Sequence, residues 1–142
     1  MVLLMMNLAN SDPLSSAEVR SLRSRGRILI VEDNYLAACA LSDWLVGWGY
    51  EIVGPVGSKD EAQKLAEDPD LTGAILDISI HGGTSADVAD VLDRHKTPYI
   101  FVTGYAQADL LPPRFASQRL LRKPIDEDSL RRAVNAEFGE VN

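Results

Sequence analysis

Four short apolar segments of this chain each end in charged or hydroxyl-bearing residues, and this pattern limits the folds that the chain can adopt. The segments span residues 27–31, 74–76, 99–102 and 119–122, and they lead into Glu32-Asp33, Asp77, Thr103-Gly104 and Lys123-Pro124. In a sheet of parallel strands the carboxyl ends meet at one edge, which is where ligands bind. That edge would carry a cluster of carboxylates, a hydroxyl and an ammonium group. Such a set can hold a hard divalent cation and present one carboxylate to a phosphoryl group.

Strand-like and helix-like patterns alternate from residue 27 onward in about five units. This alternation predicts an α/β fold, a doubly wound five-stranded parallel sheet with helices on both faces. The remaining predicted elements are a helix over 36–48, a strand over 51–54 and helices capped by Ser58, Thr84 and Asp126. A further helix over 106–111 should be short or distorted, because Pro112-Pro113 cannot lie inside a helix.

Residues 1–26 stand apart as an N-terminal extension to a domain spanning 27–142. A capping-box pattern at residues 15–18 predicts a short helix over about 16–24. The alternatives are a flexible tail and a misassigned start codon, because Met5 and Met6 follow Met1. The apolar start is too short for a membrane span or a secretory signal, so we expect a cytoplasmic protein.

Composition narrows the functional classes. The 142 residues carry a net charge of −7, and the pI near 4.7 argues against nonspecific binding of nucleic acid. Cys39 is the one cysteine, which excludes an internal disulfide. It lies in a helical pattern and is interpreted as a small core residue.

The four strand ends, taken together with the segment Phe101-Val102-Thr103-Gly104-Tyr105, resemble the receiver domain of two-component response regulators. The resemblance covers residues 27 to about 138 and is strongest to stand-alone receivers whose fourth strand reads Phe-x-Thr-Gly-Tyr. It implies a flavodoxin-like strand order, 2-1-3-4-5. It also implies a single-domain response regulator, not an enzyme beyond slow self-dephosphorylation, which accepts a phosphoryl group on Asp77 and signals by protein contact. The donor would be a histidine kinase or a phosphotransfer protein, the stand-alone subgroup suggests kinases of the HWE class, and the protein could form a homodimer.

The resemblance implies a role for each acidic residue. Asp33 and Asp77 would bind Mg²⁺ directly, the backbone carbonyl of Ser79 would be a third ligand, and Glu32 would hold a metal-bound water. Lys123 would pair with Asp77 at rest and with phosphoryl oxygens afterwards, and a cis Lys123–Pro124 bond would aim it inward.

Thr103 would act as the switch by donating its hydroxyl to the new phosphoryl group. Many receivers carry an aromatic residue three positions before the lysine, where this chain has Leu120. We therefore expect Tyr105 to take over the coupling. His81 is interpreted as a surface loop histidine, not as a phosphohistidine.

Two alternatives remain at this point. The first is an interaction module of the same fold that does not use phosphorylation. The second is a phosphatase with an aspartate nucleophile, which is disfavoured because such enzymes need a second acid where this chain has Ser79. An FMN carrier is disfavoured as well, because Glu32-Asp33-Asn34 would repel phosphate.

Overall fold

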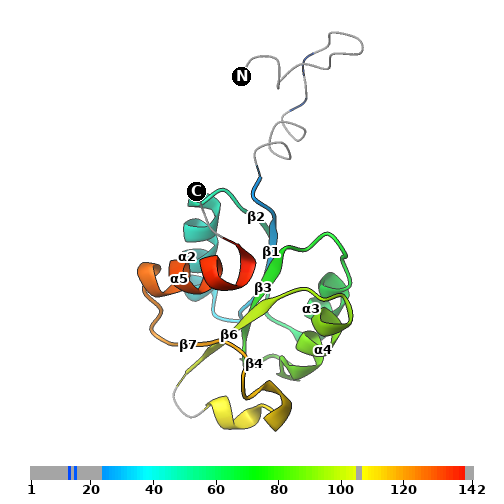
Figure 1. Cartoon of the computed structure of the whole chain (residues 1–142). Helices are drawn as coiled ribbons and strands as arrows, with labels where there is room; N and C mark the ends of the chain where they lie inside the picture. The colour runs from blue at the N-terminus through cyan, green and yellow to red at the C-terminus, as the bar shows by residue number, and fades with distance from the viewer. Residues whose placement is uncertain (1–12, 14, 16–23, 105–106, 140–142) are drawn as a thin grey trace.

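The computed structural model describes residues 13, 15, 24–104 and 107–139, and its centre is a parallel sheet (Figure 1). The strands are β1 (Arg27–Val31), β2 (Glu51–Val56), β3 (Gly73–Asp77), β6 (Tyr99–Thr103) and β7 (Leu120–Arg122). They pair in the order β2-β1-β3-β6-β7, and every pairing is parallel. Apart from a small hairpin, β4 (Ser79–Ile80) with β5 (Gly83–Thr84), this is the predicted order 2-1-3-4-5.

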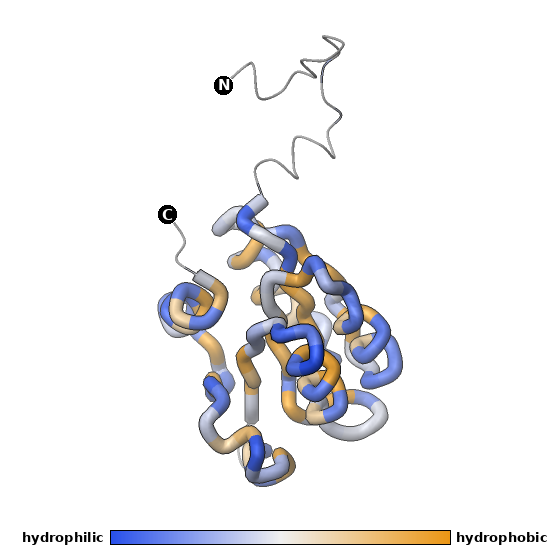
Figure 2. Tube along the Cα trace, turned by 45° about the vertical axis from the view of Figure 1, so that its right-hand side comes forward, coloured by the Kyte–Doolittle hydropathy of each residue, from blue (hydrophilic) through white to orange (hydrophobic). Residues whose placement is uncertain are grey.

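Helices cover both faces of the sheet, as predicted. They are α2 (Tyr35–Gly47), α3 (Lys59–Ala66), α4 (Ala86–Arg94) and α5 (Glu127–Phe138). Helices α2 and α5 lie on one side and α3 and α4 on the other (Figure 1). Ile28 and Ile30 pack toward α2 and α5, whereas Leu29 and Val31 pack toward α3 and α4. Because both faces are buried, β1 is apolar from Ile28 to Val31, and the strands at the centre of the molecule are mostly coloured as hydrophobic in Figure 2.

Capping explains where the helices begin. Asn34 Oδ1 accepts a hydrogen bond from the Ala37 N–H at 2.9 Å, so α2 begins one residue before the predicted start at 36. The predicted caps Ser58 and Asp126 are confirmed. The cap predicted at Thr84 is wrong by one position: Ser85 occupies the N-cap position of α4. The Thr84 hydroxyl instead accepts a bond from the Ala86 N–H at 3.4 Å.

Strand β2 is longer than the predicted 51–54. It continues through a cis Gly54–Pro55 bond to Val56, and its register against β1 shifts by one residue over this interval. Proline cannot donate to a sheet ladder, which is why the sequence suggested that the strand ends there. The edge position and the bulge accommodate it.

The helix predicted over 106–111 is replaced by two 3₁₀ turns, η2 (Gln107–Leu110) and η3 (Pro113–Phe115). The expected distortion at the proline pair is thus confirmed within the described residues. Phe115 anchors η3 by packing edge-on against Tyr99 and Phe101. Residues 16–23 of the helix predicted over 16–24 and Tyr105 lie outside the described residues, so the boundary at residue 26 stays a prediction. In the described part of the chain, no helix has the length and apolar character to cross a membrane.

Candidate functional site

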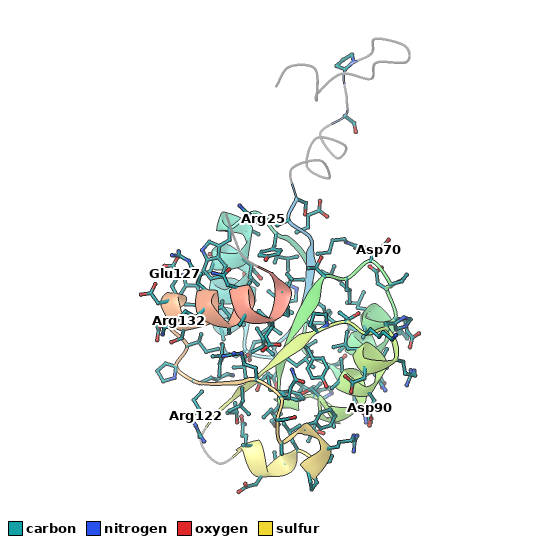
Figure 3. All side chains as sticks on the ribbon, in the orientation of Figure 1. Arg25, Asp70, Asp90, Arg122, Glu127 and Arg132 are labelled. Carbon is teal, nitrogen blue, oxygen red and sulfur yellow. The ribbon has the colours of Figure 1, made fainter. Side chains whose placement is uncertain are left out.

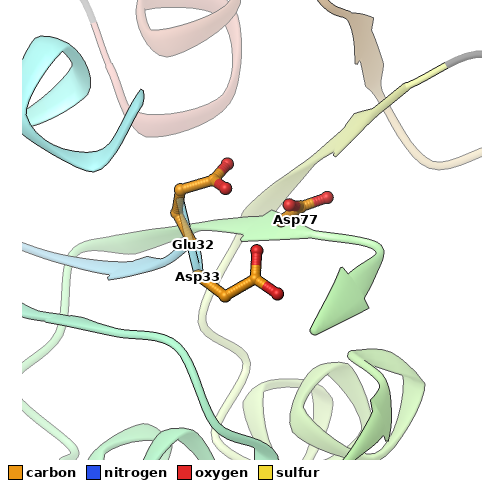
Figure 4. Close-up of side chains that lie close together, drawn as sticks. All are labelled: Glu32, Asp33 and Asp77. Atoms are coloured by element: carbon orange, nitrogen blue, oxygen red, sulfur yellow. The ribbon is translucent and has the colours of Figure 1, made fainter. Parts of the chain in front are cut away.

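The acidic residues predicted to form a cluster lie together at the carboxyl ends of the strands. Glu32 and Asp33 follow β1, and Asp77 is the last residue of β3. The register pairs Val31 with Leu76, which brings Glu32 level with Asp77. One carboxylate oxygen from each of the three lies within 4.8 Å of the others, and Figure 4 shows the side chains directed into a common space.

Lys123 reaches this cluster from the end of β7. Its Nζ lies 3.1 Å from Asp77 Oδ2, so the predicted pairing with Asp77 is present. The same ammonium lies 3.0 Å from Glu32 Oε2 and donates a hydrogen bond to Oε1 at 3.3 Å, a contact that the sequence did not suggest. The Lys123–Pro124 bond is cis, as the resemblance implied. The Lys123 N–H also donates to the Thr103 carbonyl at 2.8 Å, which ties the two strand ends together.

The electrostatics of Asp77 are those of a buried carboxylate with incomplete compensation. Its exposed fraction is 3 %. Burial and then the charge of Glu32 raise its pKa to about 6, although the hydrogen bond and charge of Lys123 act in the opposite direction. For Lys123, burial lowers the pKa, but the hydrogen bonds to Glu32 and Asp77 outweigh it and the pKa is raised. At neutral pH the site therefore holds more negative than positive charge.

Among the residues that the structure describes, the second oxygen of Asp77 has no hydrogen-bond partner. Oδ1 is buried and unpaired, while Oδ2 bonds to Lys123. A buried acceptor without a protein partner usually binds a ligand, a water molecule or an ion. Together with the exposed carboxylate of Asp33 it forms an all-oxygen donor set, which fits a hard divalent cation such as Mg²⁺.

The segment after Asp77 was predicted as a loop and is a hairpin. Ser79 pairs with Thr84 and Ile80 with Gly83 in antiparallel register. The hairpin thus fixes the backbone at Ser79, the residue whose carbonyl the resemblance assigned as a metal ligand. That role of the carbonyl stays a prediction. His81 is exposed at the hairpin turn, beside the acidic cluster in sequence but not part of it.

Thr103 ends β6 next to β3, since Val102 pairs with Asp77. Its buried hydroxyl donates to the Gly104 carbonyl at 2.9 Å, and no direct bond to Asp77 is present. The Gly104 N–H donates to Gln107 Oε1 at 2.7 Å, which ties this strand end to η2. Sequence reasoning missed Gln107; its spacing of three residues from Gly104 was the available signal.

A parallel sheet with this strand order and this edge is the architecture of a signal receiver. No family model matches the chain. Phyllosphere-induced regulator PhyR of Methylorubrum extorquens is 35% identical over 100 residues, covering 68% of this chain. The structure of SdrG from Sphingomonas melonis is 36% identical with a TM-score of 0.70, covering 78% of this chain and 94% of that one. The chain belongs to the receiver domains of two-component response regulators.

The length of the relatives and one further solved structure complete this comparison. The chain spans well under half the length of the curated relatives it matches, 38% in the case of PhyR. The receiver domain of the histidine kinase PA1611 from Pseudomonas aeruginosa, 21% identical with a TM-score of 0.70 over 81% of this chain and 98% of its own, shares the fold. That structure was solved with a magnesium ion coordinated in its active site cleft.

Proposed function

We propose that this receiver accepts a phosphoryl group on Asp77 from a histidine kinase or phosphotransfer protein and signals by contact with another protein. One observation carries the proposal. Asp77 presents a buried carboxylate whose Oδ1 is unpaired and whose Oδ2 is held by Lys123 at 3.1 Å. A carboxylate fixed at one oxygen and free at the other is poised to attack in one direction.

In the transfer, an Asp77 oxygen forms a bond to phosphorus while the bond between phosphorus and the donor imidazole nitrogen breaks. The imidazole nitrogen keeps the electron pair of that bond. Lys123 holds the Asp77 carboxylate in place before the step. It then binds phosphoryl oxygens and gives up its ion pair with Glu32.

Mg²⁺ is the proposed cofactor. Asp33, Asp77 and the backbone carbonyl of Ser79 would bind it, with Glu32 acting through a bound water. The ion, when bound, neutralises charge on the phosphoryl oxygens. Supporting observations are the oxygen cluster within 4.8 Å and the magnesium ion in the related receiver fold of PA1611.

Thr103 is the proposed switch. Its hydroxyl would leave the Gly104 carbonyl and donate to the phosphoryl group. That movement would pull on the segment that begins at Gly104, whose N–H is bonded to the Gln107 side chain of η2. Tyr105, within this segment, is proposed to relay the change, because Leu120 stands where many receivers have an aromatic residue. An HWE-class kinase as donor is proposed from the Phe-x-Thr-Gly-Tyr motif.

Labelling with acetyl phosphate tests the proposal. Wild-type protein with Mg²⁺ should gain one phosphoryl group by intact-mass measurement, and Asp77→Asn should gain none. Asp70→Asn is the matched control, because Asp70 is exposed before the start of β3, at the opposite end of the strand (Figure 3). Labelling of folded Asp77→Asn would contradict the assignment of the site. A wild type that stays unlabelled but binds Mg²⁺ would favour an interaction module.

A further inference from the structure

The loop between β2 and α3 contacts both backbone segments that carry the metal-binding residues. Its first contact is with Asp33. A Cβ atom added to Gly57 would lie 2.9 Å from Asp33 Cα and 3.0 Å from Asp33 Cβ, closer than nonbonded carbon atoms pack. The φ angle of Gly57 lies outside the left-handed region, so space and not backbone conformation requires glycine here.

The second contact is with the hairpin that follows Asp77. The Gly57 carbonyl accepts a hydrogen bond from the His81 N–H at 3.0 Å, and the Lys59 N–H donates to the His81 carbonyl at 2.9 Å. Between these bonds, Ser58 and His81 form a parallel bridge. The hairpin is therefore fastened at its turn to residues 57–59, the loop whose first residue, Gly57, lies against Asp33.

The sheet holds this loop in place from the other side. The Glu32 N–H donates to the Val56 carbonyl at 2.9 Å, which extends the β1–β2 ladder to the residue before Gly57. Gly57 cannot move away from Asp33 without breaking that bond, and Ser58 caps α3. The loop is thus fixed at both of its ends.

We propose that Gly57 and the backbone N–H of Lys59 are positioning groups of the metal site. Gly57 sets how closely Asp33 approaches the loop, and the two bonds to His81 set where the segment after Asp77 lies. Together they fix the separation between the two sources of ligands. The inference deepens the proposed function and rests on it, because Mg²⁺ demands near-ideal octahedral geometry and tolerates little displacement of its carboxylates.

Gly57→Ala tests the contact with Asp33. We expect its dissociation constant for Mg²⁺, measured by titration calorimetry, to rise about tenfold, the effect typical of residues that orient metal ligands. Gly47→Ala is the matched control, because a Cβ atom at Gly47 would meet nothing within 4 Å. Its Mg²⁺ affinity should stay within about twofold of wild type. Equal affinity in Gly57→Ala and wild type would overturn the role of Gly57.

A pair of substitutions at Lys59 tests the bond to the hairpin. Lys59 is the first residue of α3, where proline is accepted, and Ser58 before it has the extended conformation that proline requires. Lys59→Pro thus removes the N–H and leaves the helix intact. Lys59→Ala keeps the N–H and removes only the side chain, including its ion pair with Asp87. Weaker Mg²⁺ binding in Lys59→Pro than in Lys59→Ala supports the proposal, whereas equal binding overturns the role of this N–H.

Thermal unfolding in EDTA separates positioning from loss of structure. The variants should unfold cooperatively, and Gly57→Ala should lose metal affinity even at temperatures where it is fully folded. If Gly57→Ala does not fold, the Lys59 pair still decides whether this loop positions the segment after Asp77 for the metal. Failure of the wild type to bind Mg²⁺ would overturn the proposed cofactor and this inference with it. Tight binding by wild type and both test variants would overturn the positioning role alone.

Discussion

At the scale of single residues, Asp77 combines burial, a like-charged neighbour and one cationic partner. Burial and Glu32 raise its pKa from the usual 3.8 to about 6, so the ionised carboxylate is less favourable in the folded than in the unfolded state. The folded protein therefore loses stability from this group as the pH rises from 3.8, where the unfolded carboxyl ionises, to about 6, and above that the loss is constant. Well below pH 3.8 the group is protonated in both states and the loss vanishes.

Asp77→Asn should consequently stabilise the metal-free protein at pH 8. The shift in pKa corresponds to at most roughly 3 kcal/mol, and we expect about 1–2 kcal/mol because Lys123 loses a partner. Urea denaturation in EDTA at pH 8 and pH 5 measures the difference, which should shrink at the lower pH. The exposed control Asp70→Asn should show no such trend. A gain that grows toward pH 5 would show that the pKa of Asp77 is not raised.

Thr103 supplies a second test at this scale. Thr103→Ala removes the hydroxyl but leaves the acidic cluster, so it should still take up beryllofluoride, a phosphoryl mimic, at Asp77. The beryllofluoride-induced changes in amide chemical shift at residues 32–33 should match those of wild type. The changes over residues 107–115 should be lost. Full shifts of 107–115 in Thr103→Ala would show that the signal leaves the site by another route.

Tyr105 and Leu120 form a matched pair for the same route. Tyr105→Ala should diminish the beryllofluoride-induced shift changes over 107–115 more than Leu120→Ala does, because Tyr105 directly follows Gly104 in the chain. Equal effects of the two substitutions would argue against a relay through Tyr105.

At the scale of elements, side-chain contacts from η3 anchor the described part of the segment between β6 and β7, which contains no α-helix. Phe115 is 6 % exposed and packs edge-on against Tyr99 and Phe101. Arg114 stacks on the Phe115 ring and forms a bidentate ion pair with Asp90 of α4. Leu120, which stands where many receivers have an aromatic residue, pairs with Phe101 and packs against the apolar cluster that contains Phe115.

Phe115→Ala should therefore destabilise the domain by about 2–4 kcal/mol through the lost contacts and the cavity. Leu110→Ala is the control, because Leu110 is 52 % exposed in the neighbouring 3₁₀ turn and should change stability by at most about 0.5 kcal/mol. Urea denaturation curves give both values. A cost for Phe115→Ala no larger than that for Leu110→Ala would mean that η3 is not anchored by its aromatic ring.

The sequence predicted elements whose signals are local. The strands, the starts of α3 and α5 and the distorted fourth helix could be anticipated, because apolar runs, the caps Ser58 and Asp126 and the proline pair each act within a few residues. The hairpin after Asp77 depends on bonds between His81 and the loop at residues 57–59, more than twenty positions away. The bulge at Gly54-Pro55 likewise depends on pairing with β1. Such partners leave no local pattern.

At the scale of the whole molecule, the site joins strand ends that are distant in sequence, and a bound ion should stabilise the entire domain. At a Mg²⁺ concentration ten times its dissociation constant, binding contributes about 1.4 kcal/mol. For a domain of this size that raises the melting temperature by roughly 3–5 °C relative to EDTA. Asp33→Ala should lose most of this gain. An equal gain in wild type and Asp33→Ala would exclude Asp33 as a ligand.

The position of Lys123 has a consequence for how the protein is made. Its two carboxylate partners precede it by 91 and 46 residues, so the ribosome delivers both acids well before their counterion. A nascent chain that has emerged only through β6 would have to bury Glu32 and Asp77 without that cation. The free-energy cost of burying two unpaired carboxylates would keep the carboxyl-end edge of the sheet exposed to water. Completion of β7 then supplies the counterion, and α5 follows to cover one face of the sheet. Chains that terminate before Lys123 should accordingly be cleaved by proteases faster than the full-length protein.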